Sequence, residues 1–139
     1  MKQSCSTFQK EDVFGMKVSQ LSLEGPLLLE PKVFQDTRGF FFEGYHKEKF
    51  RSFGIDCDFV QSNHSFSIQN TIRGLHYQEK PGQAKLVSVA SGKIFDVVLD
   101  IRPNSPTFGQ WEGVYLDAEE HKQLYIPIGF AHGFCVVSP

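Results

Sequence analysis

Short apolar runs separated by glycine and proline turns constrain this chain more than any other feature of its sequence. Most of the runs are too short for a helix with a buried face, and turn residues such as Pro81-Gly82 and Ser91-Gly92 stand between them. Aromatic residues make up 14% of the chain, which favours strands over helices. The 139 residues suffice for one domain with a single core. The sequence therefore predicts an all-β sandwich or barrel, with a jelly roll as the leading form.

The expected elements are about nine short strands and one short helix. The strands are expected over residues 27–34, 40–45, 59–64, 71–78, 85–90, 94–101, 110–116, 124–126 and 131–137. The turn Ser91-Gly92-Lys93 predicts a hairpin between two of these runs, and Gly54 is expected to end a helix over 47–53. Residues 1–20 are polar and weakly patterned. They indicate a terminal arm, disordered or exchanged with a partner subunit, before a domain at 21–139.

Bulk properties exclude two classes of partner. The formal net charge is -2 and the pI is near 6.2, so nothing in the overall charge indicates nucleic-acid binding. No apolar run approaches transmembrane length, and the first residues lack the apolar core of a signal peptide. The three cysteines, Cys5, Cys57 and Cys135, are an odd number without a C-x-x-C pair, which indicates free thiols. We expect a soluble cytoplasmic protein without a membrane partner.

Polar side chains concentrate on two successive predicted strands. Arg73, His76 and Gln78 lie on the first strand, and Gln83 and Lys85 lie at the start of the second. Polar groups on strands with buried apolar neighbours require partners. Either these groups satisfy one another inside a core, or they line a pocket for a charged ligand, and we favour the pocket.

The two-residue period of a strand predicts which polar groups meet. Asp96 and Asp100 share one face of their strand. Arg73 and His76 are three residues apart, which places them on opposite faces of a regular strand. A β-bulge at Gly74 would bring them to the same face.

Seven motifs carry a resemblance to a known family. They are Asp36-x-Arg38-Gly39-Phe40-Phe41-x-Glu43, Phe59-Val60-Gln61-x-Asn63-x-Ser65, Arg73-Gly74-Leu75-His76-Tyr77-Gln78, Gln83-x-Lys85-Leu86-Val87, Asp96-Val97-x-x-Asp100-x-Arg102, Ser105-Pro106-Thr107-Phe108-Gly109 and Ile126-Pro127-x-Gly129-Phe130-Ala131-His132-Gly133-Phe134. In this order they resemble the dTDP-4-dehydrorhamnose 3,5-epimerase family over residues 21–139. The resemblance implies a cupin-like jelly roll, a homodimer with exchanged strands, and no cofactor.

The resemblance also implies a reaction, the epimerisation of dTDP-4-keto-6-deoxy-D-glucose at C3 and C5 to dTDP-4-keto-L-rhamnose, on the way to L-rhamnose and surface polysaccharide. Such inversion requires proton removal next to the C4 ketone and stabilisation of an enolate. His76 resembles the base, Lys85 would stabilise the enolate oxygen, and Asp96 would hold Lys85 in place. Lys85 and Asp96 also fit a purely structural ion pair.

The other motif residues resemble a substrate-binding set. The set is Arg38, Phe40, Glu43, Gln61, Asn63, Arg73 and His132. The guanidinium groups suit a diphosphate, the aromatic ring suits thymine, and the carboxylate and amides suit the nucleotide's polar groups, while the imidazole resembles a sugar contact. Three of these assignments have structural alternatives. Arg38 fits a solvated surface residue, the two amides share a strand face and fit backbone capping equally well, and His132 fits a core histidine.

No metal is expected, although many cupins bind one. Their sites need two histidines one residue apart, a carboxylate and a later histidine. Here Gln78 follows His76 at that spacing, and only His132 remains as a second candidate.

Family members continue beyond Val137-Ser138-Pro139 with a tyrosine that resembles the opposite-face acid and an aspartate that resembles the orienting partner of the base. Neither has a counterpart in these 139 residues, so we expect a C-terminally incomplete domain. Three other functions stay open: an epimerase that inverts a single carbon of a dTDP-sugar, a catalytically silent nucleotide-sugar-binding cupin, and a structural dimerisation domain.

Overall fold

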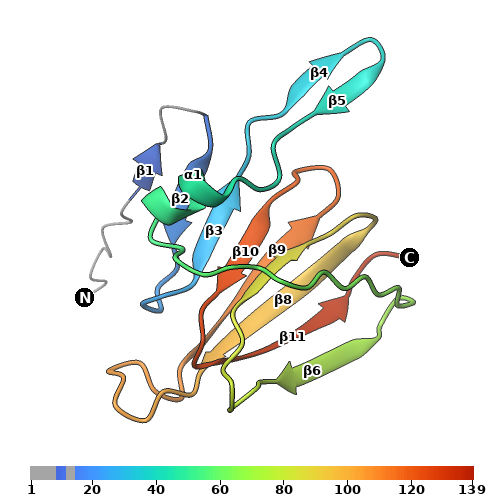
Figure 1. The fold of residues 1–139 in the computed structure, drawn as a ribbon. Coiled ribbons are helices and arrows are strands. Elements are labelled where there is room, and N and C mark those ends of the chain that lie inside the picture. Colours follow the sequence, from blue (N-terminus) through green and yellow to red (C-terminus); the bar gives the residue numbers. More distant parts are fainter. Residues whose placement is uncertain (1–8, 12–14) are drawn as a thin grey trace, which may run out of the picture.

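The computed structural model describes residues 9–11 and 15–139, which form two large antiparallel sheets, a small hairpin and one helix (Figure 1). The first sheet has the order β1 (Gln9–Glu11), β2 (Lys17–Gln20), β3 (Leu27–Glu30), β10 (Gln123–Ile126), β7 (Lys85–Ser88). The second has the order β6 (Ile72–His76), β11 (Phe130–Val136), β8 (Lys93–Asp100), β9 (Trp111–Asp117). The hairpin joins β4 (Phe34–Asp36) to β5 (Gly39–Phe41), and α1 covers Lys47–Ser52.

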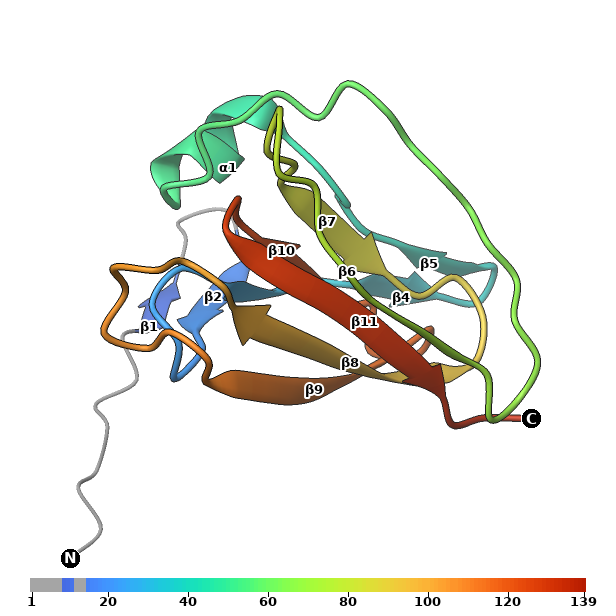
Figure 2. The same ribbon diagram turned by 90° about the horizontal axis from the view of Figure 1, so that it is seen from below.

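The chain repeatedly crosses between the two sheets, from β7 to β8, from β9 to β10 and back to β11 (Figure 2). This arrangement buries one face of each sheet against the other. Every second residue of a strand points into the interior, where Val98 and Leu116 of the second sheet contact Leu124 and Ile126 of the first, all at most 1% exposed. The prediction of an all-β jelly roll with one short helix is confirmed.

The outer face of the first sheet carries a second apolar cluster, covered by α1. Phe50 of the helix is 1% exposed and packs with Leu29, Ile55 and Tyr125. Full burial of such a side chain contributes about 1.5–3 kcal/mol. The helix ends where the sequence predicts, because Gly54 follows it in a left-handed conformation with φ of 91°.

Two details of the predicted strands are wrong. The runs on either side of Ser91-Gly92-Lys93 do not form a hairpin, because β7 pairs with β10 in the first sheet while β8 pairs with β9 and β11 in the second. Residues 59–64 are not a strand, and no strand of the described chain pairs with them. Part of the predicted arm is ordered, since β2 pairs with β3. Residues 1–8 and 12–14 lie outside the described part.

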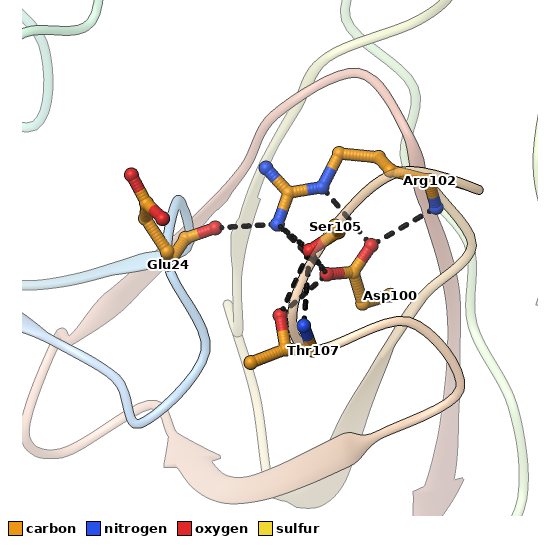
Figure 3. A network of polar contacts seen from close by, with 5 residues as sticks. All are labelled: Glu24, Asp100, Arg102, Ser105 and Thr107. Atoms are coloured by element: carbon orange, nitrogen blue, oxygen red, sulfur yellow. Dashed lines mark hydrogen bonds and ion pairs between the residues drawn. The ribbon is translucent and has the colours of Figure 1, made fainter.

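A network around Asp100 closes the connection from β8 to β9 (Figure 3). Asp100 is fully buried, and its carboxylate accepts five hydrogen bonds: two side-chain bonds and one backbone bond from Arg102, and one bond each from the hydroxyls of Ser105 and Thr107. Arg102 also donates to the carbonyl of Glu24 at 2.9 Å, which ties the loop to the first sheet's β2–β3 turn. These hydrogen bonds, above all the side-chain bonds from Arg102, hold the pKa of Asp100 far below its usual range.

We predict that Asp100→Asn lowers the free energy of unfolding by about 3–5 kcal/mol at pH 7, because it leaves Arg102 without its buried partner. Urea unfolding followed by circular dichroism measures the change. Asp36→Asn is the matched control, since Asp36 also binds an arginine two residues away but lies on the surface.

The difference in stability between the wild type and Asp100→Asn should also depend on pH. Asp100 has a depressed pKa in the folded state, so its stabilisation is present above the unfolded pKa and is lost as the pH falls toward the folded pKa. The stability gap between the wild type and Asp100→Asn should be constant above about pH 5 and narrow in acid. A gap independent of pH would contradict the role given to the carboxylate charge.

Candidate active site

A β-bulge on β6 brings Arg73 and His76 to the same face of the second sheet. His76 lies opposite His132 of β11, and Arg73 lies opposite Phe134, so a step of three residues on β6 matches a step of two on β11. Directly opposed residues share a sheet face. The hypothesis of a bulge at Gly74 is therefore confirmed, and it places both side chains beside His132.

Two glycines allow the strands to approach at this bulge. Gly74 has φ of 108°, and a Cβ atom added to it would lie 2.6 Å from Cα of Gly133 and 2.7 Å from the carbonyl oxygen of His132. Both distances are too short for non-bonded atoms. Only a residue without a side chain fits between the two backbones.

Asp96 of β8 faces the same interior and pairs with His132. The residue lies opposite Phe134 and is fully buried, and its Oδ2 atom lies 2.8 Å from Nε2 of His132. The other carboxylate oxygen, Oδ1, has no hydrogen-bond partner in the described chain. Burial raises the pKa of Asp96, and the bond to His132 only partly opposes that shift.

Lys85 reaches the interior from the first sheet. It lies opposite Ile126, which belongs to the core between the sheets. Burial lowers the pKa of Lys85, and within residues 9–11 and 15–139 no hydrogen bond or ion pair involves its ammonium group. The predicted ion pair between Lys85 and Asp96 is wrong, because His132 on the adjacent strand occupies that carboxylate while Lys85 belongs to the opposite sheet.

The structure therefore places His76, Arg73 and the buried pair of Asp96 and His132 on the face of the second sheet that Lys85 faces from the first sheet. Arg73 is exposed on the edge strand, and its Nε donates to the hydroxyl of Ser67 at 2.8 Å. His76 is exposed on the same strand, whereas the side chain of His132 is 12% exposed. Such a site can bind an anion and exchange a proton.

Other predicted binding residues lie on segments away from this interior. Arg38 and Phe40 belong to the β4–β5 hairpin, which projects beyond the large sheets, far from β6 (Figure 1). The Arg38 side chain is 88% exposed and binds Asp36 of its own hairpin at 2.6 Å. A single chain does not bring these two residues to His76.

The remaining predicted binding residues, Glu43, Gln61 and Asn63, make local contacts. Glu43 accepts a hydrogen bond from Lys49 at 2.7 Å. Nε2 of Gln61 donates to Oδ1 of Asn63 at 3.0 Å, so these two amides do lie on one side of their segment. Their predicted role at the nucleotide stays a prediction.

His121 contacts the predicted binding residue Phe40, and the sequence did not indicate this contact. Its ring lies between those of Phe40 and Phe42, with centroids 4.4 and 4.5 Å away, and it anchors the base of the hairpin. A cavity of about 270 Å³ lies beside this cluster, next to Ser88 and Gln123. No signal in the sequence points to this role, because His121 stands outside all seven motifs.

The described residues contain no group of three or more His, Cys, Asp or Glu side chains placed to hold a metal ion. In the same part of the chain, α1 is far too short to cross a membrane, and no other helix is present.

Comparisons with known proteins agree on one family. The family model described as dTDP-4-dehydrorhamnose 3,5-epimerase matches residues 20–139. The enzyme of that name from Salmonella typhimurium is 54% identical over 125 residues, which are 88% of this chain and 68% of that protein.

Two solved structures have the same fold. The dTDP-4-dehydrorhamnose 3,5-epimerase of Bacillus anthracis, crystallised with TDP and PPi, has a TM-score of 0.86 at 49% identity and covers 90% of this chain and 73% of its own. The dTDP-6-deoxy-D-glucose-3,5-epimerase of Legionella pneumophila, in complex with dTDP-4-keto-L-rhamnose, has a TM-score of 0.86 at 48% identity. The match covers 88% of this chain and 66% of the Legionella chain. The chain spans about two thirds of the length of these relatives.

We predict that Gly74→Ala disrupts the site and lowers the free energy of unfolding by more than about 3 kcal/mol, because the new methyl group meets the backbone of β11. Urea unfolding measures the loss. Gly54→Ala is the matched control: it also has positive φ, yet its Cβ would meet nothing within 4 Å, so it should cost only about 1–2 kcal/mol. Equal losses would show that φ strain, and not close approach, governs Gly74.

Proposed function

The chain belongs to the dTDP-4-dehydrorhamnose 3,5-epimerase family, and from this premise we propose that it inverts C3 and C5 of dTDP-4-keto-6-deoxy-D-glucose to give dTDP-4-keto-L-rhamnose. The observation that carries the proposal is the convergence of Arg73, His76, Lys85 and His132 on one interior. A metal-free acid–base reaction on an anionic sugar nucleotide needs such a set. The free thiols of Cys57 and Cys135 fit a reducing cytoplasm.

In the proposed reaction His76 takes the proton from the carbon next to the C4 ketone, since a neutral imidazole is a base of suitable strength near pH 7. The electron pair of the broken C–H bond moves toward the carbonyl, and the oxygen becomes an enolate. Lys85 stabilises that oxygen. Its ammonium is partly desolvated and without a protein partner in the described chain, so an anion of the substrate compensates its charge.

A proton from solvent then adds to the opposite face of the same carbon, the electron pair of the enolate forms the new C–H bond, and His76 releases its own proton to solvent before the steps repeat at the second carbon. Arg73, at the exposed edge of the interior, is placed for the diphosphate, to which a guanidinium offers paired donors. The ligands named for the Bacillus and Legionella structures, TDP, PPi and dTDP-4-keto-L-rhamnose, support this chemistry.

We further propose a homodimer in which the β4–β5 hairpin supplies Arg38 and Phe40 to the site of the partner. The hairpin makes its β-pairs only with itself, and Phe34, Phe40 and Phe41 are 55%, 58% and 70% exposed. A projecting arm that exposes three phenylalanines calls for a covering surface. Because Arg38 lies away from His76 within one chain, a second copy is the simplest source of both groups at one substrate.

An exposed apolar sheet face supports the same assembly. The outer face of the second sheet bears Ile72, Trp111 and Tyr115, which are 75%, 63% and 56% exposed, around Phe95 and Leu99. A closed twofold assembly buries the same patch on both copies. The segment 59–68, which also exposes apolar side chains and lacks a strand partner in the described chain, would find its partner in the second copy.

The first prediction for this function concerns proton exchange. Incubated in heavy water with dTDP-4-keto-6-deoxyglucose, the protein should erase the proton NMR signals at C3 and C5, because each removed proton is replaced by deuterium. His76→Asn should reduce the exchange at least about 100-fold, the lower range of a lost general base. His46→Asn, which changes an exposed histidine at the start of α1, should leave it unchanged.

Loss of only one signal would instead make the chain a single-carbon epimerase. No exchange, combined with a rise in melting temperature on adding the sugar nucleotide, would make it a binding protein and refute the epimerase function.

The second prediction tests the hairpin in trans with heterodimers isolated by two affinity tags. A heterodimer of Arg38→Ala with His76→Asn keeps one complete site if the hairpin crosses over, so it should show about half of the wild-type activity. A heterodimer of the wild type with a double variant carrying both changes should be inactive. If the hairpin serves its own chain, the two results are exchanged.

A further inference from the structure

Ser67 is the one partly buried residue in the segment that leads into β6. Every other residue from 60 to 70 is exposed. Its neighbours Phe66 and Ile68 are 85% and 72% exposed, so the two apolar side chains lie on the solvent side of the segment while the hydroxyl group lies against the protein. A hydroxyl group gains no free energy from such a position unless it forms a hydrogen bond.

A turn anchored to β11 joins this segment to β6. The backbone N–H of Thr71 donates to the carbonyl of Ile68 at 3.1 Å, and Asn70 adopts a φ of 67°, so the chain reverses its direction (Figure 2). The N–H of Asn70 donates to the carbonyl of Val136 at 2.9 Å, and the N–H of Val136 donates to the carbonyl of Thr71 at 3.0 Å. Because β11 lies between β6 and β8, these bonds fix the position of Ser67 relative to β6.

The hydrogen bond of Ser67 determines which edge of the Arg73 guanidinium is available to a ligand. Nε of Arg73 donates to Oγ of Ser67 at 2.8 Å. A guanidinium can bind two oxygen atoms of an anion through Nε and Nη2 or through Nη1 and Nη2. Nε carries a single hydrogen atom, and Ser67 accepts it. Only the edge formed by Nη1 and Nη2 therefore remains for paired binding.

Arg73 also differs from the other arginines in the charge of its partner. Arg38, Arg51 and Arg102 each bind a carboxylate. Within residues 9–11 and 15–139, no hydrogen bond or ion pair involves Nη1 or Nη2 of Arg73. A neutral hydroxyl holds the guanidinium without cancelling its positive charge, so Arg73 keeps that charge for an anion.

We propose that Ser67 is a positioning residue for anion binding, because it holds Arg73 with the edge of Nη1 and Nη2 presented to the diphosphate of the sugar nucleotide. The identity of this anion rests on the proposed function. A side chain that is already immobilised loses less conformational entropy when the ligand binds, so the bond to Ser67 raises the affinity of Arg73 for the diphosphate.

Titration calorimetry with TDP tests the proposal without turnover. Ser67→Ala should weaken TDP binding by about three- to tenfold, because the freed Arg73 side chain must then be ordered by the ligand. Ser67→Thr keeps a hydroxyl group and should bind TDP like the wild type. Ser62→Ala is the matched control, since Ser62 is exposed on the same segment and forms no side-chain hydrogen bond in the described chain.

A double variant separates positioning from a structural role or a direct contact. In an Arg73→Ala background, Ser67→Ala should cause no further loss of TDP affinity, because the side chain that it positions is already absent. Losses that add in the double variant would overturn the proposal, since they would show that the hydroxyl group acts independently of Arg73.

Kinetics give a second measurement. Ser67→Ala should raise KM by a similar factor and leave kcat nearly unchanged, because the diphosphate is bound equally in the ground state and the transition state. A fall in kcat with unchanged KM would contradict the positioning role.

The outcomes distinguish this inference from the proposed function. TDP binding that is unchanged in Ser67→Ala would overturn the inference alone. TDP binding that depends on Ser67, in a protein that exchanges no proton at C3 or C5, would overturn the epimerase function alone. A wild-type protein that does not bind TDP would overturn both.

Discussion

The contact between Gly74 and Gly133 is the constraint on which the site depends. It lets β6 carry one extra residue against β11 and so turns two side chains at an odd spacing toward the same interior. The same irregularity leaves Ile72 on the opposite, outer face, across from Cys135. One local feature of the backbone therefore gives β6 both its polar inner face and its apolar outer face.

The second sheet reverses the usual distribution of polarity over part of its area. Its inner face buries Asp96 and Asp100, while its outer face exposes Trp111 and Tyr115. Asp100 is compensated by its network with Arg102, but a single domain gains nothing from the partly uncompensated Asp96 or from the exposed aromatic surface, because burying a carboxylate costs free energy and exposed surface contributes no hydrophobic stabilisation. Both features are explained together if the interior binds a charged substrate and the outer face packs against a second copy.

The sequence predicted the fold class well because its main signals are local. The two-residue alternation and the glycine and proline turns located β6, β8, β9, β10 and β11 to within a few residues. The hairpin at Ser91-Gly92-Lys93 failed because a turn sequence reports a reversal of the chain but not which sheet receives the next strand. The strand at 59–64 failed because a strand needs a partner, which local sequence does not supply.

The candidate site was predicted only in part, because the sequence reports local features but not the partners of a residue on neighbouring strands. The period along one strand correctly placed Asp96 and Asp100 on one face, which the structure shows to be the inner one, and Gly74 correctly indicated a bulge. Partners across strands depend on register, which local sequence does not encode. Asp96 was therefore assigned to Lys85, whereas the register of β8 with β11 brings it to His132.

The two aspartates of β8 lie on the same face of the strand but have different electrostatic roles. Both are fully buried on the same face, four residues apart. Asp100 has five donors, led by an arginine, and its pKa falls far below the usual range, so its charge is permanent and serves the fold. Asp96 has one donor and an unpartnered oxygen, and burial raises its pKa. A carboxylate whose charge the protein does not fully compensate is poised to share a proton, and this is the one that faces the histidines.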